Sequence, residues 1–210
     1  MKPELEQVTP AEIETRSFEI IESELPHPID PTLAPIIKRV VHTTADFDYV
    51  DNLFFSDGVV EQALNAIRNG ACIVTDTNMA KAGINKTELA KYGGEAFCFM
   101  ADEDVKAAAK ANGTTRAVAS MDKACTIDRP LILAVGNAPT ALVRICELIE
   151  AGKLSPALVI GVPVGFVNVV PAKEMVLQAG VPCIVARGRK GGSNVAAAIC
   201  NALLYLLGRG

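Results

Sequence analysis

The sequence predicts a three-layer α/β/α domain, in which a mostly parallel sheet of five strands follows an N-terminal helical extension. A chain of 210 residues has the size of one ordinary domain. From about residue 70 onward, short apolar runs alternate with helical patterns. The runs are apolar at consecutive positions, which is typical of strands covered by helices on both faces. We expect residues 1–210 to form a single domain, with a helical part over 1–68 and a parallel-sheet part over 69–207.

The expected elements follow one another in a regular order after the N-terminal part. Helices are expected at 10–24, 31–47 and 57–68, separated by breaks rich in proline and aspartate. Strands are expected at 71–75, 96–100, 131–135, 158–162 and 182–187. Helices at 102–111, 115–125, 139–150, 172–178 and 193–207 complete the pattern. This alternation is typical of βαβ units, which place helices on both faces of a parallel sheet.

Composition and charge exclude several classes of function. The chain has 20 Lys and Arg residues against 24 Asp and Glu, a net charge of −4, whereas a nucleic-acid binder has a basic excess. Its apolar runs are shorter than the ~20 residues of a membrane-spanning helix. Residues 1–10 lack the apolar core of a secretory signal. We therefore expect a cytoplasmic protein with neither a nucleic-acid partner nor a membrane partner.

The cysteines and histidines show no metal-binding pattern. The six cysteines are spread along the chain without a CxxC pair, and most lie in apolar segments. This is typical of buried, reduced thiols, with disulfides or a zinc site as the alternative. The two histidines, His27 and His42, are distant from each other and do not give the usual zinc spacings. We expect no metal site.

The loops that follow the expected strands are rich in polar and charged residues. Asp76 follows the first strand, Asn137 and Thr140 follow the third, and residues 187–194 follow the fifth. Ligands of parallel sheets bind at the carboxyl ends of the strands, where the strand order reverses. Since these loops meet at that edge, we expect the binding site there.

Residues 188–193, with the sequence GRKGGS, are a candidate anion site. The glycine-rich turn contains Arg189 and Lys190 and leads into a helix, with Ser193 as the expected N-cap. Free backbone N–H groups and the helix dipole favour an anion at such a place. The stretch matches neither the Walker A loop nor the dinucleotide-binding fingerprint. An ordinary helix start with two solvated cations is the alternative interpretation.

His42 is the candidate proton donor, because His27 lies between two prolines and is expected to be an exposed linker residue. On a helix, Lys38 and Arg39 share a face with His42. A histidine in this setting can gain a proton as an acidic substrate binds. The solvated basic edge of a helix explains the same residues.

Two further sets of residues are open to two interpretations. Arg116 is expected at the start of a helix, where the dipole disfavours a cation, so either a ligand anion or a surface arginine explains it. Arg16 and Ser17 lie in an amphipathic helix and are by themselves consistent with ordinary packing.

Taken together, these stretches resemble one known family. The chain contains RVVHTTADFD at 39–48, TDT at 75–77, GI at 83–84, GNAPTAL at 136–142, GVPVGFV at 161–167 and GRKGGSNVAAA at 188–198. In this order they resemble the precorrin-8X and cobalt-precorrin-8 methylmutases of cobalamin biosynthesis, from about Arg16 to Leu207. The stretches at 42–48 and 188–193 are more similar to the anaerobic, cobalt-dependent branch. One departure is the segment 168–172, where the family usually has GAAES, while Lys173 is kept.

The resemblance implies a flavodoxin-like fold, a homodimer with sites near its interface, and an isomerase. The enzyme would move a methyl group from carbon 11 to carbon 12 of the corrinoid, with His42 as the general acid that protonates the macrocycle. The residues that would bind the corrinoid are Arg16, Ser17, Arg39, Thr43, Asp76, Arg116, Asn137, Thr140, Arg189, Lys190, Gly191, Gly192 and Ser193. The reaction would need no cofactor, and any cobalt would be part of the substrate.

Two other functions remain open on the sequence. A non-catalytic tetrapyrrole carrier would bind the same ligand without turnover. A nucleotide-dependent enzyme on a Rossmann-like sheet is the second, although the glycine fingerprint is missing after the first strand.

Overall fold

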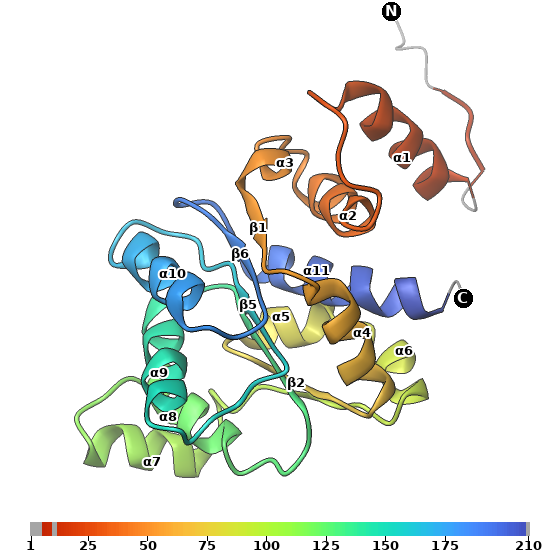
Figure 1. Cartoon of the computed structure of the whole chain (residues 1–210). Helices are drawn as coiled ribbons and strands as arrows, with labels where there is room; N and C mark the ends of the chain where they lie inside the picture. The colour runs from red at the N-terminus through yellow and green to blue at the C-terminus, as the bar shows by residue number, and fades with distance from the viewer. Residues whose placement is uncertain (1–5, 10–11, 209–210) are drawn as a thin grey trace, which may run out of the picture.

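A six-stranded sheet is the middle layer of the computed structural model, which describes residues 6–9 and 12–208 (Figure 1). Its strands are β1 (Leu53–Phe55), β2 (Cys72–Thr75), β3 (Ala96–Phe97), β4 (Leu131–Val135), β5 (Leu158–Gly161) and β6 (Cys183–Ala186). They lie in the order β1-β6-β5-β4-β2-β3, and β2 to β6 are parallel. The parallel strands have the flavodoxin-like order, with the switch point between β2 and β4. The predicted fold class is confirmed.

The sheet has one strand more than the five that the sequence predicts. β1 pairs with β6 in the antiparallel direction, with Leu53 opposite Ala186 and Phe55 opposite Ile184. The prediction missed it because a strand of 3 residues between two helical segments is too short to show a pattern. β1 closes the edge of the sheet beside β6.

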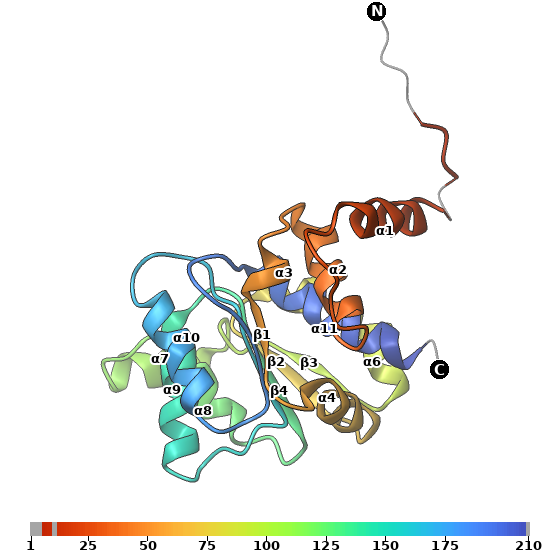
Figure 2. The ribbon, with the colours of Figure 1, turned by 45° about the horizontal axis from the view of Figure 1, so that its top comes forward.

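Helices cover both faces of the sheet, as Figure 2 shows from a second direction. One face packs against α8 (Arg116–Ala124), α9 (Pro139–Glu150) and α10 (Val169–Gln178), and α7 (Glu103–Ala111) packs on α8. The other face is covered by α4 (Val59–Arg68), α5 (Asn78–Gly83), α6 (Lys86–Lys91) and α11 (Ser193–Leu207). Outside this layer lie α1 (Ile13–Glu24), α2 (Ala34–Thr44) and α3 (Tyr49–Asn52), with α2 packed on α11.

Alternate side chains of the central strands enter two different cores. In β4, Leu131, Leu133 and Val135 face the layer of α8 to α10, whereas Ile132 and Ala134 face the layer of α11. Each of these side chains is at most 5% exposed. Burial on both faces explains why the strand is apolar at every position.

Several expected boundaries are wrong. The helix expected over 31–47 ends at Thr44, because Ala45 adopts the left-handed conformation with φ 53°. The strand expected over 96–100 is only Ala96–Phe97, and α3, α5 and α6 were not expected. Residues 10–11 of the first expected helix lie outside the described residues. Within the part of the chain that the structure describes, no helix is both long and apolar enough to cross a membrane.

The loops after β4, β5 and β6 pack tightly against one another. A Cβ atom added at Gly136 would lie 2.7 Å from the carbonyl oxygen of Gly192 and 2.7 Å from Cα of Ser193. The N–H group of Gly192 donates to the carbonyl of Val162 at 2.9 Å. The carboxyl edge of the sheet is therefore one packed unit in which backbone touches backbone.

We expect the substitution Gly136→Ala to lower the free energy of unfolding by about 1–3 kcal/mol, because backbone atoms cannot move aside as a flexible side chain would. Gly161, opposite Val135 in the neighbouring strand, is the matched control. An added Cβ there meets side-chain carbons at 3.4 Å or more. Gly161→Ala should change the free energy by less than about 1 kcal/mol in urea unfolding. Equal losses in both variants would contradict the close packing of the edge.

Candidate active site

Asp76 is buried at the switch point of the sheet and joins the loop after β2 to the loop after β4. It follows β2, is 1% exposed, and its carboxylate accepts hydrogen bonds from the backbone N–H groups of Gly136 (2.8 Å), Asn137 (2.8 Å) and Ala138 (2.6 Å) after β4. Burial raises the pKa of Asp76 above its usual value, while the N–H donors oppose that rise. The direct contact with substrate that the sequence predicted does not fit this burial. Asp76 instead positions the loop that follows β4.

The glycine-rich turn lies next to this switch point. Ser193 is the first residue of α11, and its Oγ lies 2.7 Å from Oγ1 of Thr77, the N-cap of α5. The expected Ser193 cap is wrong: Gly192 is the N-cap, and the Ser193 hydroxyl points to Thr77. Gly192 and Ser193 are thus brought beside the loops of β2 and β4, and Gly191 lies against Val162 after β5.

Lys190 joins this turn to the end of α2. Its Nζ donates to Asp46 Oδ2 at 2.7 Å and to Asp48 Oδ2 at 2.5 Å. Both aspartates follow His42 closely in the sequence. The ion pairs therefore bring the region of His42 to the carboxyl edge. They also engage the Lys190 ammonium, which the sequence predicted to bind the substrate.

Arg39 is enclosed by α1 and α11. Its guanidinium forms an ion pair with Glu14 and lies 4.9 Å from the ring centre of Phe18 and 5.1 Å from that of Tyr205. The Arg39 side chain is only 15% exposed. The neighbouring Lys38 pairs with Glu22 of α1. The basic edge of α2 is thus paired with acidic residues of α1.

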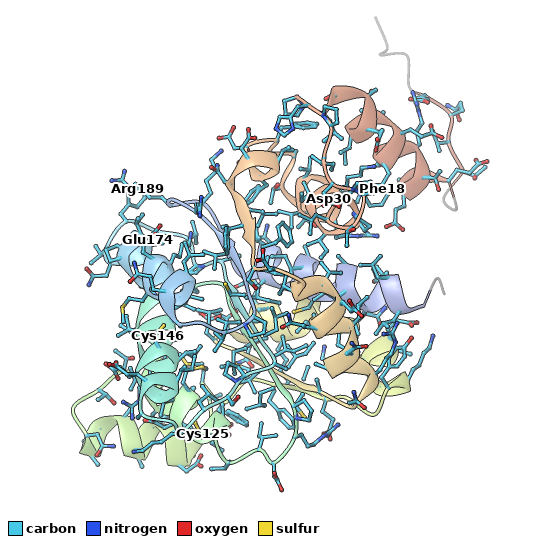
Figure 3. The ribbon with its side chains drawn as sticks, in the orientation of Figure 1. Phe18, Asp30, Cys125, Cys146, Glu174 and Arg189 are labelled. Carbon is cyan, nitrogen blue, oxygen red and sulfur yellow. The ribbon has the colours of Figure 1, made fainter. Side chains whose placement is uncertain are left out.

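His42 is exposed near the C-terminal end of α2. Its imidazole stacks on the Phe18 ring, with 5.4 Å between centres and 29° between planes. Figure 3 shows Phe18 on α1 beside α2. The same phenyl ring therefore contacts both the imidazole and the Arg39 guanidinium, and it fixes their relative position.

Three other predicted residues of α1 and α2 are engaged within the protein. The hydroxyl of Ser17 donates to the carbonyl of Ile13 at 2.8 Å, and that of Thr43 donates to the carbonyl of Arg39 at 2.9 Å. Arg16 pairs with Glu6 at 2.7 Å and Glu19 at 3.3 Å. The structure does not bring Arg16 to the carboxyl edge by any contact among the described residues.

The remaining predicted residues lie at the N-termini of α8 and α9 or are exposed on the loops. Oγ1 of Thr140 lies 3.4 Å from Oγ1 of Thr115, the N-cap of α8, and Arg116 is the next residue. Asn137 is exposed above Asp76, and its backbone N–H, not its side chain, is held. These residues surround the switch point. Nη1 of Arg116 donates to the carbonyl of Met100 at 3.4 Å, so this guanidinium is partly engaged within the protein, whereas the Asn137 side chain is exposed.

Exposed apolar side chains line the loop between β5 and α10. Phe166 is 80% exposed, Val167 77% and Val164 48%. The Arg189 guanidinium lies 5.2 Å from the ring centre of Phe166. Exposed apolar groups beside a cation can contact a ligand that has both apolar and anionic parts.

A cavity of about 770 Å³ lies between α1, α2 and α11. Its wall is mostly apolar, with Phe18, Arg39 and Tyr205 contributing to it. The sequence did not predict this cavity, because it depends on how α1 crosses α2. Since Phe18 also stacks on His42, the cavity adjoins the candidate proton donor.

The six cysteines are unpaired. Five are buried and Cys125 is half-buried, which agrees with the predicted buried, reduced thiols. No group of three His, Cys, Asp or Glu side chains that could hold a metal ion occurs among residues 6–9 and 12–208.

Sequence reasoning did not single out Phe18 and Thr77, whose side chains contact His42, Arg39 and Ser193. Thr77 could have been found, since it follows Asp76 in the same loop. No sequence pattern marks Phe18, because its contacts with His42 and Arg39 depend on the packing of α1 on α2.

The doubly wound sheet, with its switch point between β2 and β4, defines an α/β domain of the class that binds ligands at the carboxyl edge. A model of the precorrin-8X methylmutase family matches residues 12–206. A cobalt-precorrin-8 methylmutase from Salmonella typhimurium is 46% identical over 94% of this chain and 96% of its own length. Another from Priestia megaterium is 43% identical over 97% of this chain and 91% of its own. A solved precorrin-8X methylmutase structure from Thermus thermophilus is 41% identical, with a TM-score of 0.86 over 95% of this chain and 98% of the other.

The chain belongs to the precorrin-8X methylmutase family. It is therefore an enzyme, a methylmutase of the isomerase class in cobalamin biosynthesis. This membership settles the choice against the carrier and the nucleotide-dependent enzyme that the sequence alone left open.

We expect Asp76→Asn to lower the free energy of unfolding by about 2–4 kcal/mol, because one buried amide group then faces N–H donors and the charge-assisted hydrogen bonds are lost. Asp128, an exposed aspartate before β4, is the matched control. Asp128→Asn should change the free energy by less than about 0.5 kcal/mol in the same urea titration. A tolerated Asp76→Asn would show that the switch point does not depend on this carboxylate.

The Lys190 ion pairs should make stability depend on pH. The hydrogen bond from Lys190 holds the pKa of Asp46 below its usual value. A carboxyl group whose pKa is lowered on folding stabilises the protein above its unfolded pKa and loses this effect as the pH falls through the folded pKa. Lys190→Met should therefore destabilise the protein at pH 7, and its difference from the natural protein should shrink below about pH 4.

Lys110→Met is the control for this measurement, since Lys110 is an exposed lysine on α7. Its difference from the natural protein should not change between pH 7 and about pH 3 in thermal unfolding. A Lys190→Met difference that is constant with pH would be evidence against the role of Asp46.

Proposed function

We propose that this chain moves the methyl group on carbon 11 of cobalt-precorrin-8 to carbon 12 and thereby forms cobyrinate, or converts precorrin-8X to hydrogenobyrinate. The names of the relatives at 46% and 43% identity support the cobalt-containing substrate. The structural observation that carries the proposal is His42, an exposed imidazole held against Phe18 and joined to the carboxyl edge through Lys190, Asp46 and Asp48.

The corrinoid would lie at the carboxyl edge, between the switch point and α2. Its carboxylates would contact Arg116, Arg189 and the N–H groups of the turn at 191–193, since charge-assisted hydrogen bonds are stronger than neutral ones. Its apolar face would pack on Phe166 and Val164, which are exposed on the neighbouring loop. Local cations are necessary because the protein as a whole has a net charge of −4.

His42 would act as the general acid. A proton on a ring nitrogen of the macrocycle makes the conjugated system electron-poor, which favours migration of the methyl group with its electron pair. The bond from carbon 11 to the methyl carbon breaks as the bond to carbon 12 forms. The product has the same formula as the substrate, so the proton returns to His42 or to water at the end of turnover. Arg39 would position the imidazole through Phe18, because Glu14 already occupies its guanidinium.

The assembly and setting of the enzyme follow the same proposal. We infer a homodimer with the sites near its interface, which the resemblance to the family implies. A cytoplasmic location agrees with the six unpaired cysteines. The proposed reaction includes no separate cofactor, and an isomerisation consumes neither an electron donor nor a group donor.

His42→Ala should lower turnover of cobalt-precorrin-8 by about 100-fold or more while corrinoid binding persists, because the proton donor is lost and an exposed helix position tolerates Ala. His27→Ala is the matched control. His27 lies on the surface, where its ring contacts Asp51 and the Pro28 carbonyl, and its turnover should stay within about twofold. The absorbance of the corrinoid measures turnover and binding in both variants. Turnover of His42→Ala within about tenfold of the natural enzyme would remove His42 from this role.

Dialysis against a strong chelator should leave the rate unchanged with cobalt-precorrin-8 and with precorrin-8X, because any cobalt enters within the substrate. The absorbance assay with both substrates checks this and compares their rates. If activity fell and then returned on addition of a divalent ion, the enzyme would need a metal of its own.

A further inference from the structure

Lys173 is a buried charge that the proposed reaction does not use. Among the described residues, it and Asp76 are the only buried side chains of the Asp, Glu, Lys and Arg types, each 1% exposed. Lys173 lies on α10, and its Nζ donates to the carbonyl oxygens of Gly188 and Lys190, both at 2.8 Å. No carboxylate among the described residues forms an ion pair with it.

This arrangement is costly for stability alone. Burial lowers the pKa of Lys173 to about 8, since an ammonium without a carboxylate partner is poorly solvated inside the protein. Apolar residues of similar volume often stabilise such positions better. The Lys173 side chain therefore has a role that an apolar residue could not fill. The two carbonyl groups that accept its hydrogen bonds indicate this role.

The two acceptors lie on either side of Arg189. The carbonyl of Arg189 itself accepts a hydrogen bond from the N–H group of Gly165 at 3.1 Å. Three consecutive carbonyl groups after β6 are thus held by α10 and by the β5–α10 loop. The backbone of Arg189 is therefore held on both sides. Its side chain is exposed, and the guanidinium lies over the Phe166 ring. Figure 3 shows Arg189 at the tip of the loop between β6 and α11, near Glu174 of α10.

We propose that Lys173 is a positioning residue of the corrinoid site, which holds the backbone on both sides of Arg189 so that this guanidinium meets a substrate carboxylate. The inference rests on the proposed function, in which Arg189 binds the corrinoid. Lys173 does not touch the substrate. It acts through the loop, in the same way that Asp76 acts through the loop after β4.

Three measurements on Lys173→Met test this: hydrogen exchange, product binding and steady-state kinetics. Hydrogen exchange without substrate should be at least tenfold faster in peptides covering 162–167 and 187–193, and unchanged in peptides covering 136–142. The dissociation constant of cobyrinate and the KM should rise at least tenfold, with kcat within threefold. Glu174→Gln, an exposed neighbour on α10, should match the natural enzyme in every measurement.

A double-mutant cycle shows whether Lys173 acts through Arg189. Arg189→Ala should weaken cobyrinate binding, and adding Lys173→Met to it should weaken binding by no more than a further twofold. Three results would each overturn the proposal. In the first, the double variant loses affinity by the product of the two single losses; in the second, Arg189→Ala binds cobyrinate as tightly as the natural enzyme. In the third, Lys173→Met has the hydrogen-exchange rates of the natural protein.

Lys173→Leu, which also lacks a hydrogen-bond donor, replaces Lys173→Met with the same expected results if the latter does not fold. Misfolding of both variants would also overturn the proposal, because Lys173 would then be required for the fold itself. If the natural protein neither binds cobyrinate nor turns over its precursor, the proposed function fails. Hydrogen exchange, measured without substrate, would still decide whether Lys173 orders the loop.

Discussion

The buried carboxylate of Asp76 is the constraint on which the carboxyl edge of the sheet depends. At a switch point the chain leaves neighbouring strands in opposite directions, and the loops there separate into a crevice. The Asp76 carboxylate spans this crevice, because it accepts hydrogen bonds from three consecutive N–H groups after β4. Gly136 can then touch the backbone of Gly192 and Ser193, so the turn before α11 is fixed against the same loop.

A second set of charges joins the helical N-terminal part to this edge. Lys190 binds Asp46 and Asp48 after α2, while acidic residues of α1 pair with Lys38 and Arg39. These ion pairs are partly exposed, so each contributes little to stability. Their effect is geometric: they place His42 between the rigid edge of the sheet and the phenyl ring of α1. The proposed proton donor and the proposed anion-binding turn therefore come from opposite ends of the chain.

The sequence predicted most of the sheet, because strands covered on both faces are apolar at every position, as Leu131–Val135 is. It missed β1, whose three residues are too few for a pattern. It predicted that the loops after β2, β4 and β6 come together, since the carboxyl ends of parallel strands meet at one edge, and the structure brings them together there. It could not distinguish residues open to a ligand from those engaged within the protein. Asp76 and Lys190 are of the second kind, and only their partners in space reveal it.

The position of the bound corrinoid tests the central claim most directly. That claim is that the carboxyl edge, held by buried charges, presents the substrate to His42. A crystal structure of the enzyme with cobyrinate should show the macrocycle over Phe166, a carboxylate on Arg189, and the His42 imidazole at about 2.6–3.2 Å from a macrocycle atom. A macrocycle held entirely in the cavity between α1, α2 and α11, with His42 and Arg189 out of reach, would contradict the account.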